Sequence, residues 1–285
     1  MASFSSRQWI AISGSVIIFA SLFYVNRQAP VSADKGPVAG GHVVNTAEDF
    51  TRVLDEAKKQ IPADDQSAID KMEQSLEGST GDGRIQLLKT IISRYDSLGA
   101  IIPATYYAEK LASLRNSADL WYKAADRYYN ASEVGDQQSR AVLIQKASEC
   151  YTNSYKIDST NLDTRVGMGK CLVEGSPNPM QGIAIIEGVL KKDSNNLNGQ
   201  LALGELSVQS GQLDKAIYRF HRVLTIKPSF SDGYLFLADA YEKNGNKQGA
   251  VECLEKYSTF ATDKKIKDEI STEIKRLKND TITNK

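Results

Sequence analysis

Few residues in this sequence have the types and spacing that catalysis or metal binding requires. The 285 residues include two histidines and three cysteines. His42 and His221 each lack the neighbouring residues that a catalytic dyad or a metal site would need. Cys150, Cys171 and Cys253 are widely spaced at apolar positions of helical patterns, which indicates buried free thiols. A disulfide is the alternative that the spacing leaves open.

Two short segments share part of the sequence pattern of a ligand-binding loop, but each lacks the rest of it. Residues 78–83 (GSTGDG) are rich in glycine, but no Gly-Lys-Ser/Thr sequence follows, so we interpret them as a surface loop. Residues 193–195 begin like a calcium loop, but Leu197 breaks the alternation of ligands and no glutamate closes it. The sequence therefore predicts no catalytic residue, no metal site, no cofactor and no enzymatic activity. An enzyme with an unrecognised site between the N-terminal helices and the later repeats is the alternative.

Charge excludes one further class of function. Charged residues make up 25% of the chain, and its formal net charge is zero. A chain with this balance has no general electrostatic attraction to nucleic acid. We predict no nucleic-acid partner.

The C-terminal half repeats itself at a spacing of about 34 residues. Five pairs show the period: Leu203 and Leu237, Gly211 and Gly245, Ala216 and Ala250, Phe220 and Leu254, Val223 and Tyr257. The alanines suit a close crossing of two helices, and each glycine suits a turn that needs a positive φ. This pattern resembles the tetratricopeptide repeat (TPR), a helical hairpin that stacks on its neighbours.

The resemblance implies an all-α fold, a right-handed α-solenoid of TPR-like helical hairpins with an N-terminal transmembrane helix. We predict a helical pair at residues 46–83, a divergent TPR-like unit at 84–118, a TPR solenoid at 119–262, and a capping helix with a frayed tail at 263–285. About ten extra polar residues near 132–141 either lengthen two helices or form a protruding loop.

The first 45 residues predict attachment to a membrane. After a short tail at 1–8, residues 9–25 contain no charge and have Trp9 and Tyr24 at their ends. We predict an uncleaved anchor followed by a flexible linker at 26–45. The alternative is a signal sequence that is removed after Ala33. The stretch between residue 25 and that site, which includes Arg27, argues against it. The short tail predicts a cytoplasmic N-terminus and periplasmic repeats, although flanking charges nearly cancel.

In TPR proteins the first helices of successive units line a concave groove. The resemblance therefore implies these partner-binding residues: Tyr122, Asp126, Tyr129, Asn130, Val166, Lys170, Val173, Glu174, Leu201, Glu205, Val208, Gln209, Leu235, Asp239, Glu242 and Lys243. Their mixture of apolar and charged groups suits an extended peptide or an amphipathic helix. Family members that clamp a C-terminal carboxylate use lysine and asparagine at positions that hold other residues here, so we do not expect that activity. The alternative is that some of these side chains pack against the N-terminal helices.

These observations predict a membrane-anchored scaffold or adaptor that binds a protein or peptide partner, within a bacterial envelope assembly or transport complex. This prediction is an analogy at the level of the fold. An import receptor of an organelle, which displays its groove to the cytosol, is the second hypothesis.

Overall fold

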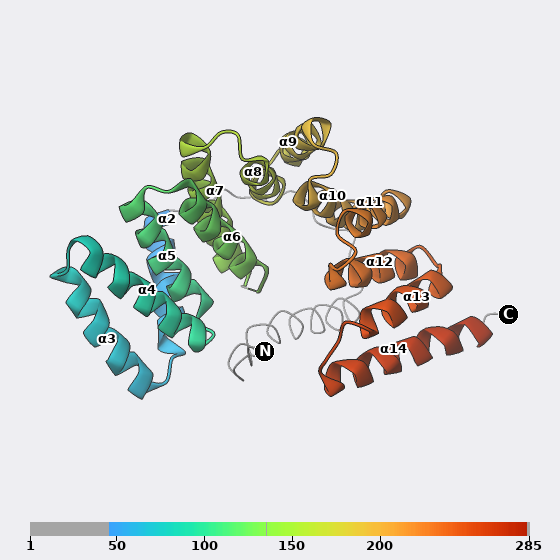
Figure 1. Ribbon diagram of the computed structural model, residues 1–285, viewed down its shortest axis with the longest axis horizontal. Coiled ribbons are helices and arrows are strands. Elements are labelled where there is room, and N and C mark those ends of the chain that lie inside the picture. The colour runs from blue at the N-terminus through green and yellow to red at the C-terminus, as the bar shows by residue number, and fades with distance from the viewer. Residues whose placement is uncertain (1–45, 135, 284–285) are drawn as a thin grey trace. The chain divides into compact units, whose positions relative to one another are not determined.

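The computed structural model describes residues 46–134 and 136–283, and all regular structure in these residues is α-helical. The helices are α2 (Thr46–Lys59), α3 (Ala63–Glu77), α4 (Gly81–Ser97), α5 (Ile101–Arg115), α6 (Ala118–Val134), α7 (Gln137–Ile157), α8 (Leu162–Gly175), α9 (Pro179–Lys192), α10 (Leu197–Gln209), α11 (Leu213–Ile226), α12 (Ser231–Lys243), α13 (Lys247–Ser258) and α14 (Lys264–Thr283). The predicted all-α, TPR-like architecture is confirmed (Figure 1).

The predicted anchor at 9–25 and linker at 26–45 lie outside these residues. Within the described part of the chain, no helix combines the length and the apolar character needed to cross a bilayer.

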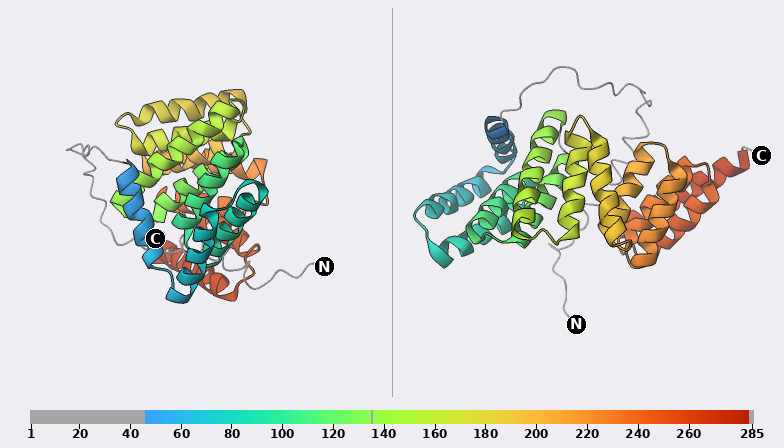
Figure 2. Two further views of the ribbon diagram at one scale, coloured as in Figure 1. Left: turned by 90° about the vertical axis from the view of Figure 1, so that its left-hand side faces the viewer. Right: turned by 90° about the horizontal axis from the view of Figure 1, so that it is seen from above.

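The chain divides into two compact units between Pro179 and Met180. Unit 1 contains α2 to α8 and ends at Pro179, the first residue of α9, while unit 2 contains the rest of α9 and α10 to α14. In unit 1, α4 pairs with α5 and α6 pairs with α7, while α5 packs on α6 and α7 on α8. In unit 2, α10 pairs with α11 and α12 with α13, and α14 packs on α13. Successive antiparallel hairpins follow one another in each unit (Figure 2).

Small residues at the helix crossings explain this packing. Ala216 and Ala250 are fully buried or nearly so, with Phe220 and Leu254 buried one turn further on. Gly211 and Gly245 have φ values of 72° and 79°, as the sequence predicts for the turns. A residue with a Cβ atom is disfavoured in this left-handed region, so glycine suits the sharp reversal between the two helices.

The extra polar residues near 132–141 lengthen two helices, which was one of the two alternatives. Helix α6 has 17 residues and α7 has 21. Asp136 caps the start of α7, because its carboxylate accepts hydrogen bonds from the backbone N–H groups of Gln138 (2.9 Å) and Ser139 (2.8 Å).

Three predicted boundaries differ from the structure. The predicted loop at 78–83 is wrong beyond residue 80, because Gly81 has a φ of 55° and already begins α4. The apolar pattern places the start of the second helix at Asp65, whereas α3 begins at Ala63, directly after Pro62 as its N-cap. The tail expected from Asn279 onward continues α14 as far as Thr283.

Two helices, α2 and α3, occupy the range of the predicted helical pair, but they pack on different neighbours. Helix α2 packs against α5 and α7, whereas α3 packs against α4. One ion pair, from Lys58 to Glu73 at 2.9 Å, joins α2 to α3. The apolar stripe of α2, with Phe50, Val53 and Leu54, is buried in this position, and the Phe50 ring packs against Tyr106 and Tyr128.

Candidate partner-binding surface

The predicted groove residues of unit 1 lie on α6 and α8, which contact each other. The Tyr129 hydroxyl donates a hydrogen bond to Glu174 Oε1, and Arg140 on α7 forms an ion pair with Glu174 Oε2. Lys170 Nζ lies 3.9 Å from the centre of the Tyr129 ring, a cation–π contact. Tyr129, Lys170 and Glu174 therefore form one cluster, which Arg140 of α7 joins from the side. Asp126 belongs to the same cluster because its carboxylate interacts with the charge of Lys170. We call the four predicted residues Asp126, Tyr129, Lys170 and Glu174 the inner cluster.

Asp126 contributes a carboxylate that is largely shielded from water. Burial raises the pKa of Asp126, while the nearby Lys170 ammonium and hydrogen bonds from Tyr151 and Asn130 partly offset that effect. Asn130 Nδ2 donates to Asp126 Oδ2 at 3.4 Å. The carboxylate of Asp126 is thus held in a site where a further hydrogen-bond donor or positive charge would stabilise it.

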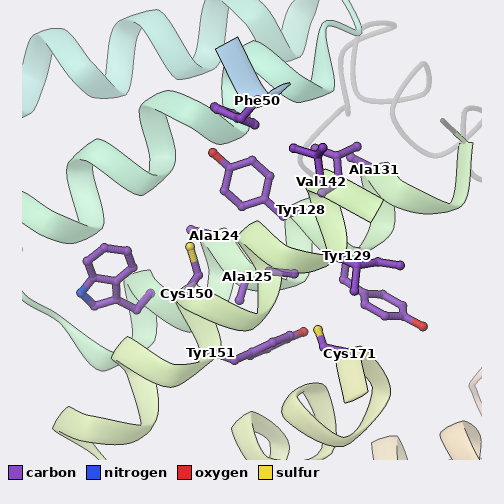
Figure 3. Packing of buried hydrophobic residues seen from close by; sticks show 14 of the residues in the cluster. Phe50, Ala124, Ala125, Tyr128, Tyr129, Ala131, Val142, Cys150, Tyr151 and Cys171 are labelled. Atoms are coloured by element: carbon purple, nitrogen blue, oxygen red, sulfur yellow. The ribbon is translucent and has the colours of Figure 1, made fainter. Parts of the chain in front are cut away.

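Tyr151 forms the base of this surface, and a glycine makes room for it. The Tyr151 ring is buried and lies 5.9 Å from the ring of Tyr122. A Cβ atom on Gly167 of α8 would lie within 2.6 Å of three atoms of the Tyr151 ring. Figure 3 shows Tyr151 lying flat between its own helix and Cys171 of α8. Gly167 therefore permits the close approach of α8 that brings Lys170 and Glu174 to α6.

The remaining predicted residues of unit 1 differ in exposure. Val166 is buried, so its side chain offers little surface to a partner. Tyr122 and Val173 are half-buried, and Asn130 is exposed. Figure 3 shows the neighbouring residues Tyr128 and Tyr129 pointing in different directions, Tyr128 toward Phe50 and Tyr129 away from it.

The predicted residues of unit 2 lie on α10 and α12. Leu201, Glu205, Val208, Leu235, Asp239 and Glu242 are half-buried, while Gln209 and Lys243 are exposed. Val208 and Leu235 pack against the apolar core of the unit. Lys243 pairs with Asp239 at 2.8 Å within α12. Arg276 of α14 forms an ion pair with Glu242 at 2.5 Å, so the capping helix occupies one side of this surface.

Sequence reasoning missed Arg140, Tyr151 and Arg276 as neighbours of this surface. A signal for two of them was present. Arg140 precedes Glu174 by one repeat period, and Arg276 follows Glu242 by the same interval. The repeat period therefore relates each arginine to its acidic partner. Arg140 lies one repeat before Glu174, and Arg276 lies one repeat after Glu242.

The arrangement of these side chains suits the binding of a partner, and the described residues show no metal-binding group or reactive thiolate in it. Among the described residues, no group of three or more His, Cys, Asp or Glu side chains could hold a metal ion. Cys150, Cys171 and Cys253 are buried free thiols, as predicted. Burial raises the pKa of the Cys171 thiol to about 12 and that of Cys253 to about 11, so neither is a reactive thiolate at neutral pH.

Comparison with known proteins agrees with this fold. The family model described as a tetratricopeptide repeat matches residues 207–266. A tetratricopeptide repeat protein from Parabacteroides merdae ATCC 43184 is similar in structure, with a TM-score of 0.52 and 15% identity over 81% of this chain and 88% of that chain. No curated protein matches the sequence.

Two further solved structures are similar at lower scores. MamA from Desulfovibrio magneticus RS-1 has a TM-score of 0.42 and 17% identity over 63% of this chain and 95% of that chain. YrrB, a TPR protein with an unusual peptide-binding site, has a TM-score of 0.39 and 16% identity over 70% of this chain and 97% of that chain. At these identities, likeness to solved structures concerns the fold alone. The described chain is thus a protein of TPR-like helical hairpins, whose residues 207–266 match tetratricopeptide repeats.

Proposed function

We propose that this protein is a scaffold that binds a protein or peptide partner on the first helices of its repeats. The inner cluster carries the proposal. Packing of α6 on α8 does not need charged groups, yet two carboxylates, an ammonium group and a tyrosine hydroxyl converge there at partial burial. Partly buried charges are costly unless they are paired, and they can add specificity when a partner completes the pairing.

The chemistry of the cluster suggests which partner group would bind. Asp126 has a raised pKa because of burial, so a donor that approaches its carboxylate gains more than it would at an exposed acid. A lysine, an arginine or a backbone N–H of an extended peptide supplies that donor. Tyr122 beside it is only partly buried, so part of its surface is open to apolar contact. We therefore expect a partner segment that combines a donor with an apolar side chain.

A photo-crosslinking experiment tests the proposal. A photoreactive amino acid at Tyr122 or Val173 should capture the partner from cells, whereas the same group at the exposed positions Gln145 of α7 or Glu252 of α13 should not. Asp126→Ala should reduce capture at both inner positions. Capture from Gln145 and Glu252 but not from the inner positions would refute the proposal.

We further propose that the chain is anchored in a bilayer by residues 9–25 and that its repeats work in an assembly or transport complex of the bacterial envelope, with the N-terminus cytoplasmic and the repeats periplasmic. The uncharged sequence of this segment supports the anchor. Carbonate extraction of membranes should leave the protein in the pellet, and deletion of residues 9–25 should release it. Protease treatment of spheroplasts should digest the repeats, and protection of them would place the repeats on the other side.

A further inference from the structure

Helix α2 shows how an amphipathic helix binds to the outer side of these repeats. It lies against α5 and α7, the second helices of two successive hairpins. The Phe50 ring of α2 lies 5.7 Å from the Tyr128 ring and 6.0 Å from the Tyr106 ring. Lys146 Nζ lies 5.3 Å from the centre of the Phe50 ring and forms an ion pair with Glu109 at 2.6 Å. An aromatic anchor above a lysine–glutamate pair therefore defines this binding position.

The same position recurs in unit 2. The small residues at the helix crossings, Ala104 of α5 and Ala147 of α7, correspond to Gly182 of α9 and Ala216 of α11. With these pairs aligned, Glu109 and Lys146 correspond to Glu187 and Lys215. Residues of the same two types as the pair beneath Phe50 therefore lie on α9 and α11, where Lys215 Nζ donates a hydrogen bond to Gln212 Oε1 at 2.6 Å.

Unit 2 has a pocket at this position. It measures about 330 Å³, and Glu187 and Lys215 are among its lining residues. Ile183 of α9 and Leu203 and Leu206 of α10 provide its apolar surface. Where unit 1 has Tyr106 beside Phe50, the aligned residue of unit 2 is the smaller Ala184. The small side chain of Ser207 is among those that line the pocket.

Two exposed apolar side chains lie on the helices that form this pocket. Met180 of α9 is 63% exposed and Tyr218 of α11 is 60% exposed, more than any other large apolar side chain of the described residues. Tyr218 lines the pocket, and Met180 lies on the face of α9 that carries Ile183.

The repeat does not require either side chain. At one and two repeat periods further along the chain, Met180 corresponds to Asp214 and Gln248. One period before and one period after Tyr218, the chain has Ala184 and Glu252. Polar or small residues are therefore sufficient for folding at both positions. A large apolar side chain that is exposed in the lining of a pocket, as Tyr218 is, is typical of a binding site, and Met180 is exposed on a helix that contributes to the same pocket.

We propose that this pocket, the outer groove of unit 2, binds an amphipathic helix of a partner protein. The helix carries an aromatic anchor followed by aliphatic residues three and four positions later, as Phe50, Val53 and Leu54 do in α2. Lys215 and Glu187 at the groove call for charges of both signs on the flanks of that helix, a property that α2 also has. Because α2 of this chain is packed against α5 and α7, the occupant comes from another protein.

The test uses a fluorescein-labelled peptide of residues 46–61 (TAEDFTRVLDEAKKQI) and fluorescence anisotropy with the full chain in detergent. We expect saturable binding that Met180→Glu or Tyr218→Glu weakens about tenfold or more, with unchanged circular dichroism because both residues are exposed. A peptide with alanine in place of Phe50 should lose binding. Gln248→Glu, at the position of α13 that matches Met180, serves as the control and should bind normally.

Two outcomes would overturn the inference. The first is an absence of saturable binding. The second is binding that Met180→Glu and Tyr218→Glu leave unchanged, since the peptide would then be exchanging with α2 in unit 1. Asp126→Asn in the inner cluster should not affect peptide binding, so failure here is distinct from failure of the proposed function.

Discussion

Replacement of Gly167 by alanine should destabilise unit 1 although alanine is the better helix former. A Cβ atom at this position would lie 2.6 Å or less from Cε1, Cζ and Cε2 of Tyr151, where ordinary contacts begin at 3.4 Å. The nearest ring atom, Cζ, would lie at 2.2 Å, so the ring or helix α8 must move by about 1.2 Å, from 3.4 minus 2.2. The ring is buried against Tyr122 and Cys171 and has little room to move.

The expected size follows from two opposing terms. Overpacking in a dense core costs about 1–3 kcal/mol. Alanine in place of a helical glycine recovers about 0.5–1 kcal/mol. The two terms leave a net loss of about 0–2.5 kcal/mol. Because the overlap with the buried ring is large, we expect the upper part of this range, about 1–2 kcal/mol, which lowers the melting temperature by about 2–8 °C for a domain of this size.

Urea denaturation followed by tryptophan fluorescence would measure this loss. Trp121 lies in the core of unit 1, and a Trp9→Phe background leaves it as the sole tryptophan. Gly83→Ala on α4 of the same unit is the matched control, because a Cβ atom there meets nothing within 4 Å, and it should be neutral or stabilising. Tyr151→Leu removes the three ring atoms, so Gly167→Ala should cost less in that background. The reasoning fails if Gly167→Ala is as harmless as Gly83→Ala, or if its cost is the same with leucine at 151.

Three further outcomes are expected. Because burial raises the pKa of Asp126, the ionised carboxylate destabilises the folded state at any pH above the ordinary carboxyl pKa of 3.8. Asp126→Asn should therefore raise the urea midpoint at pH 7, and this gain should vanish below pH 3.8, where the carboxyl is protonated in both states. Gly245→Ala should cost about 1 kcal/mol in thermal unfolding because φ is 79°, and Gly245→Asn should cost less. Iodoacetamide at pH 8 should leave the buried Cys150, Cys171 and Cys253 unmodified by mass spectrometry, and all three should react in strong denaturant; rapid labelling of the native protein would contradict their burial.

The helical hairpins of unit 2 could be predicted because their determinants are local and periodic. An alanine at each crossing and a glycine at each turn recur at a fixed spacing, and Ala216, Ala250, Gly211 and Gly245 have the burial and backbone angles that this spacing implies. The role of each of these residues depends only on its own hairpin and the neighbouring one. A pattern of that kind is readable from one sequence.

The position of α2 could not be predicted in the same way. Its apolar stripe indicates that one face is buried, but a stripe does not specify the surface that buries it. The groove between α5 and α7 depends on Tyr106 and Tyr128, which lie far from Phe50 in sequence. Gly81 was similarly ambiguous, since a glycine with a φ of 55° can end a loop or begin a helix.

The residues that distinguish one binding surface from another lie outside the repeat pattern. Tyr128 and Tyr129 are adjacent on α6, and a helix places adjacent side chains about 100° apart. Tyr128 therefore contacts Phe50 and Glu109 on the outer side, while Tyr129 contacts Lys170 and Glu174 on the other. The repeat pattern of small residues and glycines that specifies the helical hairpin does not determine the contacts of Tyr128 or those of Tyr129. Selection for a partner can thus act on these positions without disturbing the helix crossings, which is why a repeat identified from sequence reveals the fold and leaves the partner to be found from particular side chains.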